Sequence, residues 1–158
     1  MKNYKVDQAI IMAAGFGSRL VPLTYDTPKG LLKVHGEPMV ERQIKQLKEV
    51  GVDDITIVVG YLKESFDYLC DKYGVKLLYN PDYASKNNLS TIYHALPLLI
   101  DKSSYILSSD NWIRENIFHS YEDRSWYCSV YMKGATSEWC LDYDENDKIT
   151  AVSIGGHD

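Results

Sequence analysis

Short apolar runs alternate with segments of helical periodicity through the first two thirds of this chain. Strands are predicted at Ala9–Ala13, Ile55–Val59, Lys76–Tyr79 and Tyr105–Ser108. Helices are predicted between them, at Val40–Val50, Lys63–Tyr73 and Ser90–Ile100. This alternation favours parallel strands joined by crossover helices on both faces of one sheet. The sequence therefore predicts an α/β, Rossmann-like fold, in which ligands bind beyond the carboxyl ends of the strands.

The helical periods also predict which side chains face the sheet. These are Val40, Ile44 and Leu47 in the first helix, Phe66, Leu69, Cys70 and Tyr73 in the second, and Ile92, Ala95, Leu96 and Leu99 in the third. Gly51 and Gly74 follow the first two helices, and glycine commonly ends a helix. We expect Pro97 to bend the last turn of the third helix.

The last third of the chain changes character. Strands are predicted there at Trp126–Lys133, Glu138–Tyr143 and Lys148–Ile154, and the last two are joined by a polar turn. No linker, repeat or low-complexity tract separates this part from the rest. A length of 158 residues is that of one ordinary domain, so we expect a single domain over residues 1–158.

Composition excludes several classes of function. The net charge of −5 argues against a surface for nucleic acids. No apolar run approaches the roughly 18 residues that a membrane span needs, and the first residues contain no signal-peptide segment. The three cysteines show no metal-binding or disulfide spacing. We expect a soluble, cytoplasmic protein without a membrane span or a nucleic-acid partner.

The segment after the first predicted strand carries the strongest functional signal. Its small residues Ala14, Gly15 and Gly17 allow a polyphosphate to approach the backbone, so that N–H groups can point at its oxygens. Arg19 offers a planar fork of donors and Lys29 a point charge, and both cations suit phosphate oxygens. The combination indicates a site for a nucleoside triphosphate.

Two common types of phosphate-binding loop fit this segment less well. A dinucleotide-binding fingerprint needs a third glycine, and Leu20 stands in its place. A Walker-type loop needs Gly-Lys-Ser/Thr before a helix, which the chain lacks. A tight turn without a ligand stays open, although Pro22 and Pro28 favour an irregular loop over a long helix.

The run from Gly15 to Lys29, G-x-G-S-R-L-x-P-L-T-x-x-T-P-K, resembles the signature of nucleotidyltransferases that activate sugar phosphates and related phosphoesters. The resemblance continues through Leu32, Val34, Gly36, Pro38, Val40 and Glu41. Further downstream the chain is similar to one branch, the bacterial CTP:phosphocholine cytidylyltransferases. The segments that carry this similarity are Val59–Glu64, Phe66–Leu69, Lys72–Val75, Asn87-Asn88, Asp110-Asn111, Ser129–Tyr131 and Glu138-Trp139.

The resemblance implies a Rossmann-like, three-layer nucleotidyltransferase fold with a mostly parallel sheet and an antiparallel C-terminal part. It also implies transfer of CMP from CTP to phosphocholine, which gives CDP-choline and pyrophosphate. A phosphomonoester is mostly dianionic at neutral pH and needs no general base, so the protein has to supply position and positive charge. Lys29 and Arg19 are the candidate catalytic cations, and the four scattered histidines are expected to be structural or exposed.

Asp110, after the last predicted strand of the sheet, is the candidate ligand for Mg²⁺, although a turn or helix-capping role is the alternative. Relatives often carry a second acid two positions earlier, where this chain has Ser108. They also continue for several strands and helices beyond the position of Asp158. We therefore expect the chain to lack the C-terminal portion of its domain, and with it a second metal carboxylate.

For the base and ribose, the resemblance indicates Gly60, Tyr61, Asn87, Asn88 and Ser90, with Asn88 equally able to cap the helix that follows. For the acceptor, the faces of Trp and Tyr bind a trimethylammonium group, often beside a carboxylate. Trp139 next to Glu138 is the main candidate, with Trp112, Tyr131 and Tyr143 as lesser ones. The alternative for each aromatic side chain is ordinary packing in or on a sheet.

Two other functions stay open at this point. The chain could be a sugar-1-phosphate nucleotidyltransferase, since that class shares the segment from Gly15 to Lys29. It could also be a non-catalytic nucleotide-binding fragment of a larger, bifunctional protein. Apolar surface left uncovered in such a fragment would favour a homodimer, and a fused downstream domain is the other partner that stays open.

Overall fold

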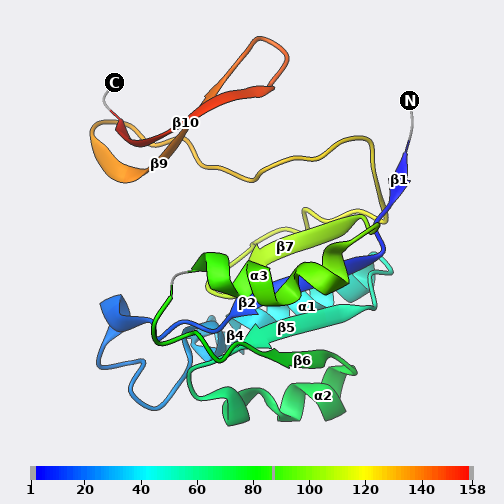
Figure 1. The fold of residues 1–158 in the computed structure, drawn as a ribbon, viewed down its shortest axis with the longest axis vertical. Coiled ribbons are helices and arrows are strands. Elements are labelled where there is room, and N and C mark those ends of the chain that lie inside the picture. Colours follow the sequence, from blue (N-terminus) through cyan, green and yellow to red (C-terminus); the bar gives the residue numbers. More distant parts are fainter. Residues whose placement is uncertain (1–2, 87, 157–158) are drawn as a thin grey trace. The chain divides into compact units, whose positions relative to one another are not determined.

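The computed structural model describes residues 3–86 and 88–156. The chain divides into two compact units, Met1–Arg124 and Ser125–Asp158, and each is described by itself. The first unit is built on a parallel sheet with helices, and the second is an antiparallel hairpin with an irregular lead-in segment (Figure 1).

The sheet of the first unit contains β2 (Gln8–Ala13), β5 (Ile55–Val59), β6 (Lys76–Tyr79) and β7 (Ser104–Ser108). Their order is β6-β5-β2-β7, and all neighbouring pairs are parallel. β2 lies inside the sheet, and it is buried on both faces, as its continuous apolar run requires. The four predicted strands of this part are confirmed, with ends that agree to within one residue.

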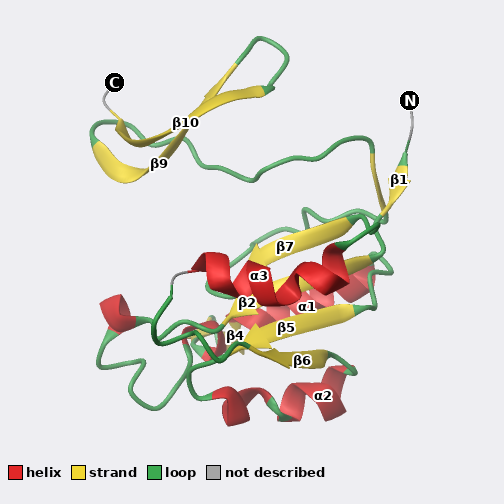
Figure 2. Ribbon diagram, in the orientation of Figure 1, coloured by secondary structure: helices red, strands yellow, loops and turns green. Residues whose placement is uncertain are grey.

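Helices cover both faces of the sheet, as Figure 2 shows for α1 (Met39–Glu49) behind it and α3 (Asn88–Leu99) in front. Ile11 and Ile57 lie in the core with Ile44 and Leu47 of α1. Their neighbours Ile10 and Val58 pack on the opposite face with Ala95 of α3. Because successive residues of a strand point to opposite faces, one apolar run supplies both cores. The three-layer α/β fold is confirmed.

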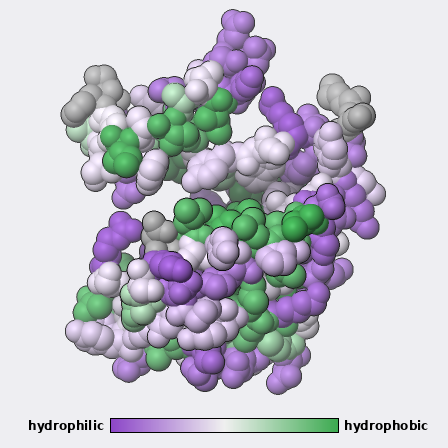
Figure 3. Space-filling model, viewed as in Figure 1, coloured by the Kyte–Doolittle hydropathy of each residue, from purple (hydrophilic) through white to green (hydrophobic). Residues whose placement is uncertain are grey.

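The helices depart from expectation in two places. The predicted helix Lys63–Tyr73 is divided into a 3-10 turn, η3 (Lys63–Phe66), and α2 (Tyr68–Tyr73), which ends at the left-handed Gly74. Leu96 of α3 was predicted to face the sheet, but 46% of it is exposed. That prediction is wrong because the sheet-facing side of α3 follows Thr91 and Ala95. Leu96 lies beside that line and is exposed. Figure 3 shows apolar surface over α3.

A buried carboxylate fastens α1 to α2. Glu41 accepts hydrogen bonds from Tyr68 Oη at 2.8 Å, Lys72 Nζ at 2.7 Å and Tyr73 Oη at 2.5 Å. Burial raises the pKa of Glu41, but the three hydrogen bonds outweigh it and leave the pKa below its ordinary value. Glu41 is therefore an ionised, fully engaged group of the scaffold.

Short elements complete the first unit. Two 3-10 turns, η1 (Ser18–Leu20) and η2 (Lys29–Leu31), lie in the long connection after β2. A small hairpin joins β3 (Lys33–Val34) to β4 (Glu37–Pro38), and β1 (Tyr4–Lys5) pairs with β8 (Tyr121–Glu122). Residues 109–120 run from β7 to β8 without a helix or strand.

The second unit contains β9 (Thr136–Tyr143) and β10 (Ile149–Gly156), paired antiparallel. These two strands and their antiparallel pairing confirm the prediction. The strand predicted at Trp126–Lys133 is wrong, because residues 126–133 have no strand structure. A strand needs a hydrogen-bonded partner, and the described strands of this unit pair with each other. Val130 and Tyr131 are accordingly 86% exposed. Among the described residues, no helix is long and apolar enough to cross a lipid bilayer.

Candidate functional site

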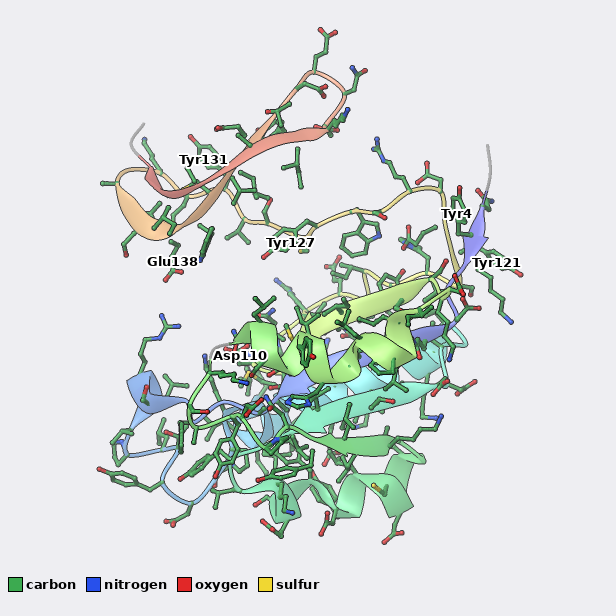
Figure 4. All side chains as sticks on the ribbon, in the orientation of Figure 1. Tyr4, Asp110, Tyr121, Tyr127, Tyr131 and Glu138 are labelled. Carbon is green, nitrogen blue, oxygen red and sulfur yellow. The ribbon has the colours of Figure 1, made fainter. Side chains whose placement is uncertain are left out.

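The parallel strands of the first unit end at one edge of the sheet, and the candidate residues of that unit follow those ends. Ala14 follows β2, Gly60 follows β5, Asn80 follows β6 and Asp110 lies two residues beyond β7. Figure 4 shows Asp110 at this edge. This is the edge at which α/β sheets bind ligands.

The loop after β2 is shaped by its two glycines in different ways. Gly17 has φ +65°, and a Cβ there would lie 3.0 Å from Thr24 Cγ2 and 3.2 Å from Lys29 Cβ. Glycine at this position thus permits a left-handed turn packed closely on Lys29. A Cβ on Gly15 would meet no atom within 4 Å, so the space beside Gly15 is open. The loop therefore has a tightly packed part and an open part.

Lys29 and Asp110 meet across the end of the sheet, although 81 residues separate them. Lys29 Nζ donates a hydrogen bond to Asp110 Oδ2, and Ser108 Oγ donates to Asp110 Oδ1 at 2.6 Å. The side chains of Lys29 and Asp110 are 28% and 24% exposed. Both groups are therefore accessible from solvent. A polyanionic ligand could contact Lys29, and a cation bound to that ligand could contact Asp110.

The electrostatics of Asp110 favour its ionised form. Partial burial raises its pKa, but the hydrogen bonds from Lys29 and Ser108 and the charge of Lys29 outweigh burial, so the pKa lies below its ordinary value. Asp110 is thus a carboxylate at neutral pH. The hydroxyl of Ser108, through its hydrogen bond to Oδ1, orients this carboxylate.

A close backbone contact, which the sequence pattern did not predict, brings Lys29 to Asp110. Gly30 of η2 packs on Ser109, and a Cβ at Gly30 would lie 2.7 Å from both Cβ and Oγ of Ser109. Only glycine allows η2 to lie this close to the residue that precedes Asp110. The isolated glycine after Lys29 was the available signal for this contact.

The second candidate cation, Arg19, lies on η1 and is exposed. It is separated from Lys29 by the irregular residues 21–28, in which Thr24 is buried. Thr24 Oγ1 donates a hydrogen bond to the carbonyl of Gly17 at 3.0 Å and closes this part of the loop. Arg19 and Lys29 therefore lie at opposite ends of a loop that is closed by the hydrogen bond between Thr24 and Gly17.

Gly60 and Tyr61 belong to the same assembly. A Cβ on Gly60 would lie 2.6 Å from Tyr83 Cβ and 2.7 Å from the Ala14 carbonyl oxygen, which also accepts the N–H of Tyr61 at 3.0 Å. Tyr61 Oη is 2.8 Å from the carbonyl oxygen of Tyr25, to which it donates. The hydroxyl of Tyr61 is thus engaged by the loop, and its ring packs against that of Phe16, with 5.0 Å between the ring centroids.

The residues predicted to contact base and ribose near α3 have different surroundings. Ser90 is buried, and its Oγ accepts a hydrogen bond from Asn80 Nδ2 at 3.1 Å. Asn88, the first residue of α3, is exposed. Asn87 lies outside the described residues. Asn88 is therefore accessible to a ligand, whereas Ser90 fixes the start of α3 to the end of β6.

The acceptor candidates are divided between the two units. Trp112, in the first, has the guanidinium of Arg42 over its ring at 4.5 Å and His35 at 5.8 Å between ring centroids. One face of Trp112 is therefore already covered by a cation of the chain itself.

The remaining candidates belong to the second unit. Trp139 pairs with Ile154 across the hairpin and is 68% exposed, and Tyr131 lies in the irregular segment. The register shifts between Ile154 and Gly156, so Glu138 lies in an irregularity of β9. Tyr143 closes the same strand and is exposed. The rings of Trp139 and Tyr143 on this hairpin are therefore exposed.

The donors present suit Mg²⁺ only in part. Among the described residues, no group of three or more His, Cys, Asp or Glu side chains is arranged to hold a metal ion. Asp110 offers one ionised carboxylate, and Mg²⁺ often takes only one or two carboxylates, its other ligands being phosphate oxygens and water. The site therefore fits a Mg²⁺ ion that arrives with a polyphosphate better than a resident ion.

A parallel sheet with a small-residue loop, a lysine and a carboxylate at its carboxyl edge has the architecture typical of nucleotide-binding α/β domains. The sequence profile of the MobA-like NTP transferase domain matches residues 9–118. The chain belongs to this family.

Several characterised proteins are similar to the chain. The choline-phosphate cytidylyltransferase of Streptococcus pneumoniae is 46% identical over 147 residues, which cover 93% of this chain and 63% of that protein. The 2-aminoethylphosphonate cytidylyltransferase of Lancefieldella rimae is 44% identical over 158 residues, covering 99% and 64%. The solved structure of a CTP:phosphocholine cytidylyltransferase from Streptococcus pneumoniae superposes with a TM-score of 0.87 at 45% identity, covering 95% and 64%. The chain thus spans a little under two thirds of the length of these relatives.

Proposed function

We propose that this chain is the nucleotide-binding part of a cytidylyltransferase that transfers CMP from CTP to phosphocholine. The observation that carries the proposal is the pairing of Lys29 with Asp110 beside the open Gly15 loop. This places one cation and one carboxylate at the sheet edge where a triphosphate and its metal would lie. The similarity to two cytidylyltransferases over nearly the whole chain supports the choice of CTP.

In the proposed reaction, a phosphate oxygen of the acceptor attacks the α-phosphorus of CTP. The bond from that phosphorus to the bridging oxygen breaks, and pyrophosphate leaves with the electron pair. No proton has to be removed from a dianionic acceptor, so no general base is required. The amide groups at Ala14, Gly15 and Gly17, together with Arg19 and Lys29, would bind the triphosphate and stabilise the charge that develops on the leaving group.

Asp110 would hold Mg²⁺, which when bound neutralises phosphate charge and favours the displacement. Ser108 keeps the Asp110 carboxylate oriented at 2.6 Å. We further propose that this chain is the first portion of a longer nucleotidyltransferase domain, whose remainder supplies a second metal carboxylate.

For the acceptor, we propose that Trp139 provides an aromatic face for the trimethylammonium group, with Glu138 and Tyr131 as neighbours in the same unit. Trp139 is exposed and available, whereas Trp112 already stacks with Arg42. We therefore rank Trp112 behind Trp139 for this role. Asn88 and the backbone at Gly60 and Tyr61 would contact the cytidine.

A second acceptor, 2-aminoethylphosphonate, is favoured by one observation. The relative named for that substrate is nearly as similar as the choline-phosphate enzyme and aligns over 99% of the chain. Both acceptors join a cationic end to a phosphoryl or phosphonyl group. A primary ammonium is strongly hydrated and needs hydrogen-bond acceptors, whereas a trimethylammonium needs aromatic faces, so the two can be distinguished by substitution of Trp139.

The test is pyrophosphate release with Mg²⁺, crossing four nucleoside triphosphates with phosphocholine, 2-aminoethylphosphonate, phosphoethanolamine and glucose-1-phosphate. It is run on this chain and on a longer chain that continues beyond Asp158. We expect release only with CTP and a cationic acceptor. The variant Lys29→Ala should lose turnover relative to the unaltered chain. Its melting temperature should change by less than about 4 °C, because a partly exposed ion pair contributes little stability. Pyrophosphate release with UTP and glucose-1-phosphate, or unchanged turnover in Lys29→Ala, would contradict the proposal.

A further inference from the structure

The segment that carries Asp110 has no regular secondary structure of its own. Residues 109–120 follow β7 without a helix or strand, so few of their carbonyl groups have partners in a helix or ladder. Buried carbonyl groups nevertheless need hydrogen-bond donors. In this chain, side chains of α1 supply them.

Three neighbouring side chains of α1 donate to carbonyl groups of this segment and of Ser108, the last residue of β7. Arg42 Nε donates to the Ile113 carbonyl at 2.6 Å, and Gln46 Nε2 donates to the same oxygen at 3.0 Å. Gln43 Nε2 donates to the carbonyls of Ser108 and Asn111, each at 2.9 Å. Side chains of α1 thus supply the hydrogen-bond donors that a neighbouring strand would otherwise provide.

Gln43 differs from Arg42 and Gln46 in the position of the carbonyl groups to which it donates. Its two amide hydrogens bind the carbonyls of Ser108 and Asn111, which stand on either side of Asp110. Ser108 in turn donates from its hydroxyl to the Asp110 carboxylate. Gln43 therefore fixes both ends of the turn whose centre presents Asp110.

The burial of Gln43 indicates that a glutamine is present here because its amide N–H groups donate these hydrogen bonds. Gln43 is 0% exposed, and its Oε1 has no hydrogen-bond partner among the described residues. A buried, unpartnered amide oxygen is a cost that an apolar side chain of similar length would avoid. A residue that only filled the core would be better as methionine or leucine, so the N–H groups account for glutamine here.

We propose that Gln43 is a positioning residue for Asp110, which fixes the turn 108–111 so that the carboxylate can hold the metal that accompanies the nucleotide. The inference rests on the proposed role of Asp110. Gln43 touches neither substrate nor metal, and it acts through the backbone on either side of the ligand. The sequence does not reveal this role, because a glutamine within an amphipathic helix gives no signal of its own.

The chain contains a matched control for this role. Gln46 lies one turn further along α1, is also buried, and donates from the same kind of atom to a backbone carbonyl of the same segment. Its acceptor belongs to Ile113, outside the turn that holds Asp110. Gln43→Met and Gln46→Met therefore remove similar amides at similar depth, with different consequences for Asp110.

The experiment measures Mn²⁺ binding in the presence of saturating CTP, by electron paramagnetic resonance, together with thermal unfolding. Loss of a group that orients a metal ligand weakens metal binding by about 10- to 100-fold. We expect this weakening for Gln43→Met and a change of less than about twofold for Gln46→Met, while both variants lose similar melting temperature. Equal effects on Mn²⁺ affinity in the two variants, or an unchanged affinity in Gln43→Met, would overturn the inference alone.

A second measurement keeps the inference testable if Gln43→Met does not fold. In the unaltered chain, the side-chain amide signals of Gln43 in a nitrogen–proton correlation spectrum should shift on addition of Mg²⁺ and CTP, and those of Gln46 should stay in place. No shift at Gln43 on saturation would overturn the inference. Absence of any Mn²⁺ and CTP binding by the unaltered chain would overturn both the inference and the proposed function.

Discussion

The contact between Gly30 and Ser109 offers a direct test of how this fold builds its site. Gly30→Ala adds one methyl group on η2, and its Cβ would lie 2.7 Å from Ser109 Cβ and Oγ and 3.2 Å from the Ser109 carbonyl oxygen. Ser109 is buried, and its N–H donates to the Met12 carbonyl of β2 at 3.0 Å. Ser109 therefore cannot retreat without disturbing the sheet, so η2 has to move.

The size of that movement follows from ordinary contact distances. Two carbon atoms prefer a separation of about 3.5–4.0 Å, so about 1 Å has to be regained between η2 and Ser109. Overpacking of this kind costs about 2 kcal/mol, which corresponds to a fall of about 4–8 °C in the melting temperature of a domain of this size. Lys29 precedes Gly30 and Asp110 follows Ser109, so their ion pair takes up the displacement. A misplacement of about 1 Å can lower turnover about 100-fold, or about 2.7 kcal/mol of activation free energy.

The assay combines calorimetric unfolding, CTP binding by titration calorimetry and pyrophosphate release. The double variant Gly30→Ala with Ser109→Gly removes the Cβ and Oγ that clash, and it should recover most of the lost stability and CTP affinity. Ser109→Gly alone gives the cost of the suppressor itself. The reasoning is refuted if Gly30→Ala leaves the melting temperature and CTP affinity unchanged, or if the double variant is no better than the single one.

Three further predictions follow from other contacts. Glu41→Gln should destabilise the chain by about 2–3 kcal/mol in urea unfolding, because the buried carboxylate accepts hydrogen bonds from two tyrosines and a lysine; Tyr73→Phe, which removes one donor, should cost about 1.5 kcal/mol. The pKa of Asp110 is held below its ordinary 3.8, so its contribution to stability is complete above that value and is lost as the pH falls through the lower folded-state value. Unfolding free energies measured from about pH 5 downward should therefore fall more steeply for the unaltered chain than for Asp110→Asn. Trp139→Ala should raise KM for phosphocholine at least about tenfold and leave that for CTP nearly unchanged, and equal effects on both substrates would argue against an aromatic cage.

The strands of the parallel sheet and the antiparallel hairpin could be predicted because each is marked by its own residues. The runs at Ile10 and Ile57 have the length and composition of buried strands, and the polar turn between β9 and β10 marks a hairpin. The same reasoning failed at residues 126–133, which have the composition of a strand but form none. The local residue pattern indicates whether a segment is able to form a strand, but the segment forms one only where another strand pairs with it.

In the candidate site, too, some features could be predicted from the sequence and others depend on tertiary structure. The sequence by itself determined the fold class and the small-residue loop with Lys29, because apolar periodicity, glycines and cations close together in the chain carry that information locally. Only the tertiary structure decided that Lys29 meets Asp110, that Gly30 packs on Ser109 and that Gln43 supports the turn around Asp110. The residues of each of these contacts lie between 65 and 81 positions apart. Such contacts depend on how α1, η2 and the end of β7 pack together, and packing is a property of the assembled layers that no single segment encodes.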